Sequence, residues 1–337
     1  MEKLKTTIKK LLVITLSFCL TANTALANTY KETNKELFFR SVNGKRYNIY
    51  NTFYDKSNKL YSLYWYNNNN YLISWNEKKY ILKKIKTPKN ILNEIIKYHP
   101  ALYYNCVMPN GNVGIHYTIR LSNKKTKKLF IIISSNGKLV SKINLGKIFK
   151  ITNNENVYYK IHNYKNNRIF VQFSINSYTE NEIKLAGVID YKKKKLLWKR
   201  KVSDNEGFCG GYSYDFGNIA KNKYMIGFNK NKDKFVISGI KNGKILQELD
   251  LDEKKENIVS YEYKNNYIYI VKKDGVYKLK WNNDKMTKII DLQNHWINKG
   301  HNYATDITVV NDNEIYITGY DPGESEKSIL FSFKKKV

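Results

Sequence analysis

The chain has 337 residues, of which 42% are hydrophobic and 14% aromatic, so its apolar side chains suffice for a sizeable core. This composition excludes a wholly disordered protein. Only four prolines occur, and no Gly/Ser-rich or Pro-rich linker interrupts the chain. We therefore expect a single mature domain.

The formal net charge is +30, and residues 1–27 carry four Lys and one Glu, so residues 28–337 keep +30 minus +3, or +27. Such a surface attracts anionic partners such as cell-wall polymers, acidic glycans, anionic lipid or nucleic acid, in a salt-dependent way. Only five of the 59 basic residues are arginine, the residue suited to bidentate phosphate recognition. The pattern favours diffuse attraction and argues against a specific nucleic-acid partner. The alternative is a solvated surface with the Lys, Asn, Ile and Tyr content of an AT-rich genome.

Residues 1–27 are typical of a secretory signal peptide. An apolar run from Leu11 to Leu20 is followed by a small-residue cleavage site, Ala25-Leu26-Ala27, and preceded by a basic region that contains Lys3, Lys5, Lys9 and Lys10. The alternative is an uncleaved anchor, but this run is shorter than the roughly 20 residues that span a bilayer. No second hydrophobic segment follows. We expect residues 28–337 to be secreted or associated with the cell envelope, with no transmembrane segment after cleavage.

Two cysteines, Cys106 and Cys209, remain after that cleavage. Two cysteines so far apart form neither a disulfide scaffold nor a metal motif. The sequence is compatible with one disulfide between them and equally with two free thiols. No cofactor is expected.

In the mature chain, helical periodicity is limited to Asn90–Tyr98, where Ile91, Leu92, Ile95 and Ile96 fall on one face. Elsewhere, short apolar or alternating runs are bounded by Asn, Gly, Asp and Lys. This pattern predicts an all-β chain.

Six similar hairpins follow one another along the chain, each with an asparagine in its turn. These asparagines are Asn58, Asn110, Asn167, Asn222, Asn266 and Asn313. They stand 52, 57, 55, 44 and 47 residues apart, which predicts a repeated structural unit.

Between these hairpins lies a second kind of hairpin. Its turns are predicted at Glu77, Asn136-Gly137, Lys192–Lys195, Asn242-Gly243 and Asn282-Asn283. The Asn-Gly pairs suit a two-residue type I′ turn, in which both central residues have positive φ. Each unit then contains four antiparallel strands, the composition of one β-propeller blade.

The last unit lacks one strand, and the segment Leu37–Val42 has no other partner. We expect it to pair with Ile329–Phe333 and close the ring, because closure removes unpaired strand edges. The sequence thus predicts a single β-propeller of six four-stranded blades, or seven if residues 87–160 contain a further blade.

Two stretches resemble known propeller repeats. "DITVVNDNEIYITGYD", from Asp306, resembles a bacterial β-propeller repeat of the form Asp-Ile-x-Val-x-x-x-Gly-Asn-Ile-Tyr-Val-Thr-Gly, with a different turn at Asp312-Asn313-Glu314. "GVIDYKKKKLLWKRKV", from Gly187, is similar to the outer hairpin of quinoprotein-like and WD40-like repeats, with lysines at the turn. These resemblances imply the fold; propellers include both enzymes and binding proteins.

No linear catalytic or cofactor motif occurs in the sequence. The best candidates for a binding face lie in two loops that each lead from an outermost strand to the next innermost strand. The loop 203–217 contributes Asp204, Glu206, Tyr214 and Asp215, and the loop 294–306 contributes His295, Trp296, His301 and Asp306. Both loops should therefore emerge on one face of the ring.

Each candidate also has a structural interpretation. Asp215 and Asp306 can cap tight turns, and Trp296 can pack between blades. The spacing of His295 and His301 matches no metal motif, so no metal site is predicted.

Two functions follow. The first is a secreted, non-catalytic propeller that binds an extracellular protein or an anionic polymer of the cell wall or a glycan. The second is a propeller enzyme, a hydrolase or lyase on an acidic polysaccharide that uses Asp204, Glu206, Asp215 or Asp306 with a histidine. A quinoprotein-like oxidoreductase ranks third, because the Leu-Trp hairpin occurs in one unit only. The sequence leans toward the first.

Overall fold

The computed structural model describes most of the chain from Tyr30 onward. The described residues are 30–37, 52–54, 60–66, 69–75, 80–98, 101–107, 112–121, 126–151, 157–176, 179–206, 218–229, 234–249, 258–283, 285–295, 297, 303–321 and 327–336. The chain divides into two compact units, residues 38–256 and residues 1–37 with 257–337. The predicted signal peptide lies outside the described residues.

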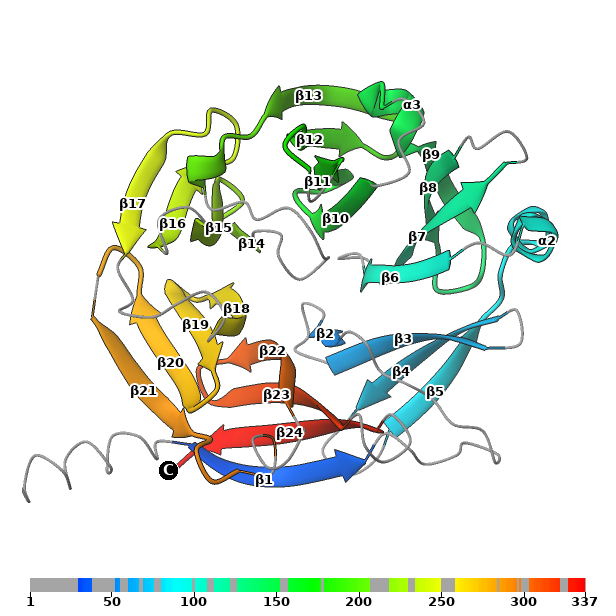
Figure 1. The fold of residues 1–337 in the computed structure, drawn as a ribbon. Coiled ribbons are helices and arrows are strands. Elements are labelled where there is room, and N and C mark those ends of the chain that lie inside the picture. Colours follow the sequence, from blue (N-terminus) through cyan, green and yellow to red (C-terminus); the bar gives the residue numbers. More distant parts are fainter. Residues whose placement is uncertain are drawn as a thin grey trace, which may run out of the picture. The chain divides into compact units, whose positions relative to one another are not determined.

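The unit of residues 38–256 contains four sheets of four strands each (Figure 1). The first consists of β2 (Thr52–Tyr54), β3 (Leu60–Tyr66), β4 (Asn69–Trp75) and β5 (Tyr80–Ile85). The second consists of β6 (Ala101–Val107), β7 (Val113–Arg120), β8 (Thr126–Ile133) and β9 (Leu139–Asn144). The third consists of β10 (Val157–Asn163), β11 (Arg168–Ile175), β12 (Ile183–Asp190) and β13 (Lys195–Lys201). The fourth consists of β14 (Asn218–Ala220), β15 (Tyr224–Asn229), β16 (Lys234–Gly239) and β17 (Ile245–Leu249).

Among the described residues of this unit, three short helices accompany the sheets: α2 (Lys89–Tyr98), α3 (Leu145–Phe149) and the 3-10 helix η1 (Asp204–Glu206). Helix α2 confirms the predicted helix, and its buried Ile91 and Ile95 pack against the second sheet. Glu94 of α2 accepts a hydrogen bond from Tyr117 (3.0 Å) and forms an ion pair with Lys142.

The unit that joins both ends of the chain contains two sheets. The fifth sheet consists of β18 (Ile258–Lys264), β19 (Tyr267–Lys272), β20 (Gly275–Lys280) and β21 (Met286–Asp291). The sixth consists of β22 (Tyr303–Asn311), β23 (Glu314–Asp321), β24 (Lys327–Lys335) and β1 (Tyr30–Leu37).

In all six sheets of the described chain, neighbouring strands are antiparallel, and in five of them the spatial order is the sequence order. Consecutive four-stranded meanders of this kind are the blades of a β-propeller. The structure therefore confirms the predicted fold, the four-stranded unit and four of the six turn positions of the first kind of hairpin, at Asn167, Asn222, Asn266 and Asn313. Asn58 and Asn110 lie outside the described residues. In the segment 87–160, the described residues add helices to the second sheet but no further sheet.

The N-terminal strand does complete the last sheet, but with other residues than expected. β1 pairs with β24 from Tyr30 opposite Lys335 to Leu37 opposite Ile329, so the described pairing includes only Leu37 of the predicted segment Leu37–Val42. Residues 38–42 lie outside the described residues. The prediction was wrong because it looked for an apolar segment. β1, YKETNKEL, is an outermost strand, and such strands commonly carry charges that discourage edge pairing.

The Asn-Gly turns also differ from expectation. Gly137 and Gly243 have φ of +84° and +69°, while the asparagines before them have no positive φ. Each turn thus has one left-handed residue, which accompanies a bulge early in the outer strand. Two consecutive left-handed residues, the type I′ pattern, occur instead at Lys221-Asn222 and at Asn265-Asn266.

Neighbouring sheets of the larger unit share apolar cores and are also linked at their outer edges. Phe130 of the second sheet and Phe173 of the third belong to one buried cluster. Ser141 of β9 donates a hydrogen bond to the carbonyl of Tyr191, in the outer turn of the third sheet (2.6 Å). The outer strand β9 thus reaches the outer turn of the sheet that follows, a relation that recurs at β13.

Candidate functional site

Four of the eight predicted binding-face residues are described by the structure: Asp204, Glu206, His295 and Asp306. The other four, Tyr214, Asp215, Trp296 and His301, lie outside the described residues, and their role stays a prediction. Each of these four described candidates forms its contacts with residues of its own unit.

Glu206 is buried in η1, directly after β13, and holds Arg200. Its Oε1 accepts hydrogen bonds from the Arg200 guanidinium at 2.9 Å and from the Ser203 amide at 2.7 Å, and its Oε2 forms an ion pair with the same guanidinium at 2.6 Å. Arg200 also donates to the carbonyl of Ile240, in the outer turn of the fourth sheet, at 2.8 Å. A Cβ on Gly243 would lie 2.7 Å from the Glu206 carboxylate, so this turn needs glycine for space as well as for its positive φ. Glu206 therefore links the third and fourth sheets.

Asp204, two residues earlier, is exposed. Its carboxylate accepts a hydrogen bond from Lys184 at 2.7 Å, and its side chain is 64% exposed. Of the two predicted carboxylates in this loop, Asp204 is accessible to a ligand, and Glu206 is engaged by Arg200.

Asp306 lies on β22, the innermost strand of the sixth sheet, and contacts the innermost strand of the fifth sheet. Its carboxylate accepts from the Ser260 hydroxyl at 2.8 Å and from the Ile307 amide at 2.9 Å. Glu262, also on β18, accepts from the Val309 amide at 2.6 Å. These carboxylates satisfy backbone N–H groups along an inner strand edge that has no further strand to pair with.

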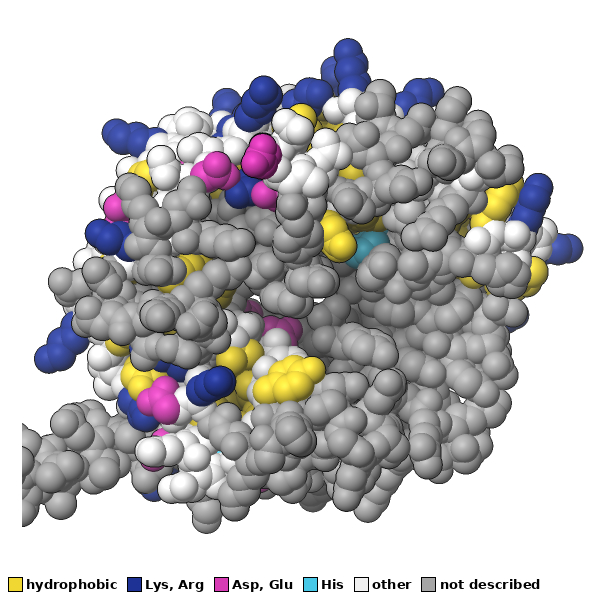
Figure 2. Space-filling model, in the orientation of Figure 1, with side chains coloured by type: hydrophobic (Ala, Val, Ile, Leu, Met, Phe, Trp, Pro, Cys, Tyr) yellow, Lys and Arg dark blue, Asp and Glu magenta, His cyan; other side chains and the backbone are white. Residues whose placement is uncertain are grey.

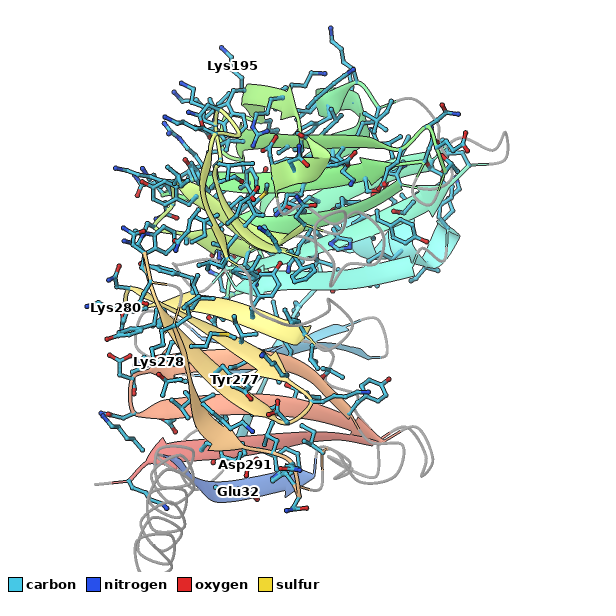
Figure 3. All side chains as sticks on the ribbon, turned by 60° about the vertical axis from the view of Figure 1, so that its left-hand side comes forward. Glu32, Lys195, Tyr277, Lys278, Lys280 and Asp291 are labelled. Carbon is cyan, nitrogen blue, oxygen red and sulfur yellow. The ribbon has the colours of Figure 1, made fainter. Side chains whose placement is uncertain are left out.

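His295 lies at the outer edge of the same sheet. Its Nε2 is 2.7 Å from a carboxylate oxygen of Glu32 on β1, and its Nδ1 accepts from the Ile297 amide at 3.3 Å. Its ring meets Phe331 of β24 edge-on, with centroids 4.6 Å apart. Figure 3 shows Glu32 on β1, where this histidine holds the strand that the N-terminus contributes.

The described acid and base candidates of this unit do not converge. Asp306 lies on the innermost strand of the sixth sheet, while the partner of His295 lies on the outermost strand. Three strand spacings separate these strands, or about 14 Å. A catalytic pair of Asp306 with a histidine thus depends on His301, outside the described residues.

Two buried ionisable residues were not singled out from the sequence, because nothing in the local pattern marks them. Burial lowers the pKa of His116 on β7 to about 3, and its ring lies 4.6 Å from that of Tyr159. Burial also lowers the pKa of Lys128 on β8, whose ammonium donates to the Thr126 hydroxyl at 2.9 Å. His116 is therefore uncharged at neutral pH, inside the second sheet's core.

Within the described ranges, no three His, Cys, Asp or Glu residues gather as metal ligands do. Among the same residues, no helix has the length and apolar content needed to cross a membrane. Figure 2 shows Lys and Arg side chains projecting from the periphery over β13 and α3, with acidic side chains lying further inward.

The fold and these residues define the protein as a β-propeller whose described candidate carboxylates largely serve its own structure. No family model and no curated protein sequence matches the chain. Among solved structures, a luciferin-regenerating enzyme is similar, with 12% identity over 90% of this chain and 98% of the other, at a TM-score of 0.47.

Two other solved structures are similar at comparable levels. BamB from Moraxella catarrhalis has 9% identity over 91% of this chain and 98% of its own, at a TM-score of 0.38. The β-propeller domain of the Trilobed protease from Pyrococcus furiosus has 11% identity over 87% and 97%, at a TM-score of 0.42. At these identities and TM-scores, the likeness carries no information about activity.

Proposed function

We propose that the protein is an exported, non-catalytic propeller that binds an anionic polymer outside the cytoplasm. One observation carries the proposal. The most buried candidate carboxylate, Glu206, is engaged by Arg200, whereas the lysines of β13 and its turn are exposed to solvent. The exposed surface of β13 and its turn is therefore cationic.

The composition supports a polymer over a specific nucleic-acid site. The expected mature charge of +27 comes almost entirely from lysine, a flexible and strongly hydrated point charge. Lysines attract anions of many shapes, and they lack the planar fork with which arginine recognises a phosphate or a guanine. Anionic wall polymers and acidic glycans present repeated charges that suit this kind of attraction.

Export rests on residues 1–27, whose pattern is that of a signal peptide. N-terminal sequencing of the protein recovered outside the cytoplasm tests it. We expect the mature chain to begin at Asn28; a chain that retains Met1 and stays in the membrane fraction contradicts it.

Retention on immobilised heparin and on isolated cell walls tests the binding. We expect retention at about 50 mM salt that falls steeply by about 200 mM, since counterion release makes such binding salt-dependent. Neutral dextran serves as the control matrix. A mature protein that passes through both anionic matrices at low salt contradicts the proposal.

A further inference from the structure

The most basic part of the described chain is the hairpin that ends in β13. Between Lys192 and Lys201, seven of ten residues are Lys or Arg. In the structure, the four lysines 192–195 are exposed, and so are Lys199 and Lys201. These six lysines are called the β13 strip below. Figure 3 shows Lys195 projecting outward from the start of β13.

The opposite face of β13 fixes the strand in place. Its exposure alternates strictly along the strand, so every second side chain turns inward. Leu196 and Trp198 pack against buried clusters, and the ring centroid of Trp198 lies 6.2 Å from that of Phe170. Arg200 is held by Glu206. The outward lysines are therefore mounted on a rigid strand, which lowers the entropy lost on binding.

Helix α3 extends the positive surface next to the strip. Lys199 donates to the carbonyl of Phe149, the last residue of α3, at 2.9 Å, which places the helix against β13. Lys147 and Lys150 of the same helix end are exposed. The lysines of two elements thus lie beside one another.

Within the described part of the chain, the recorded carboxylate contacts leave the strip's charges uncompensated. Glu206 pairs with Arg200, Asp204 with Lys184, and Asp190 accepts from the backbone amide of Lys193. The ion pairs recorded among those residues include none of the six strip lysines.

We propose that the β13 strip, with Lys150, is a binding site for a linear anionic glycopolymer that lies along the outer strand. This assignment rests on the proposed function and names its site. Outward residues two apart on a strand are about 7 Å apart. A polymer with charges repeating on that scale can meet several lysines at once, so binding is multivalent.

The surface fits a glycopolymer better than a nucleic acid. Non-specific binding of single strands relies on exposed aromatic side chains that stack on bases, whereas Trp198 packs inward against Phe170. The outward apolar residue of β13 is Leu197, 39% exposed. An aliphatic side chain can contact the carbon skeleton of a sugar or polyol but offers no stacking surface.

Edge lysines also have a purely protective role, since they discourage pairing between outer strands of different molecules. The two roles differ in their dependence on ligand length. A binding strip predicts tight association with long chains and weak association with short fragments of the same polymer. Protection alone predicts no dependence on length.

Two variants with equal charge loss test the site. The first changes Lys192, Lys193, Lys195 and Lys201 to Gln; it leaves Lys199, which contacts α3, and Lys194, which has positive φ. The control changes Lys127, Lys223, Lys241 and Lys244 to Gln; these are also exposed and lie in the same unit. Affinity is measured for heparin, a glycerol-phosphate wall polymer and a single-stranded DNA of matched charge.

We expect the strip variant to bind both glycopolymers at least about tenfold more weakly and the control to lose little, because local contacts add to the shared net charge. Equal loss in both variants overturns the site but leaves the proposed function standing. Absence of binding by the wild type overturns both. Tighter binding to DNA than to the glycopolymers overturns the choice of ligand.

A second measurement does not depend on the fold of a variant. Acetylation of wild-type lysines, followed by mass spectrometry, is compared with and without heparin. We expect Lys195, Lys199 and Lys201 to be protected and Lys241 and Lys244 to react as before. Uniform protection of all exposed lysines contradicts the assignment.

Discussion

Replacing Glu206 by alanine tests whether this carboxylate joins the third and fourth sheets. The change removes the acceptor of the Arg200 hydrogen bond at 2.9 Å and of the Ser203 amide, and it breaks the ion pair with Arg200 at 2.6 Å. Breaking a buried ion pair by removing one partner costs about 3–5 kcal/mol. Arg200 keeps carbonyl acceptors at Ile240, Gly239 and Lys201, so we take the lower end, about 3 kcal/mol.

Urea unfolding followed by tryptophan fluorescence measures the effect. With a denaturant dependence of about 1–3 kcal/mol per molar urea, the midpoint should fall by at least about 1 M. Asp204→Ala is the matched control, because that side chain is 64% exposed and its surface ion pair contributes about 0–1 kcal/mol.

The double change Arg200→Met with Glu206→Leu should recover part of the loss, because it leaves no unpaired buried charge. If Glu206→Ala and Asp204→Ala unfold at the same urea concentration, the link between the two sheets does not exist as described.

Three further predictions concern acid, backbone strain and the N-terminal strand. Because burial lowers the pKa of His116 to about 3, the unfolded chain takes up its proton near pH 6.5, before the folded chain does. The contribution of His116 to the free energy of unfolding is fully present above pH 6.5 and should fall by about 1.4 kcal/mol per pH unit from there toward pH 3. His116→Leu should remove this part of the pH dependence, as measured by urea titrations at several pH values. Lys194 has a φ of +53°, a backbone conformation that strains a residue with a Cβ. Lys194→Gly should therefore raise the free energy of unfolding by about 1 kcal/mol, whereas the control Lys193→Gly should not. A decrease in both variants shows that Lys194 is not strained. Deleting Tyr30–Leu37 should leave β24 unpaired and produce oligomers in size-exclusion chromatography; a stable monomer contradicts this.

Most of the fold could be predicted because its signals are local. An asparagine turn between two apolar runs specifies a hairpin through the conformations that asparagine tolerates, and six such turns imply a repeat. The position of β1 could not be predicted, since an outermost strand needs little apolar content. The Asn-Gly turns were misread because the bulge beside each depends on pairing with the outer strand.

The candidate site was less predictable, because a carboxylate's role depends on partners distant in sequence. Asp306 is tied to Ser260 on the neighbouring sheet, and His295 to Glu32 at the other end of the chain. One signal was present for Glu206. Arg200 is one of only five arginines in a lysine-rich chain, and arginine at a lysine-rich position indicates a need for its bidentate geometry.

The pairing of β1 with β24 also has a consequence for how the chain folds. Five sheets are built from strands adjacent in sequence, so each can form soon after its own residues are synthesised. The sixth needs both ends, since Tyr30 lies opposite Lys335. Contacts so distant in sequence form slowly, because the loop between them must close first. β1 is therefore made before the other described strands but pairs last, and for that interval β24 offers an open edge to other chains.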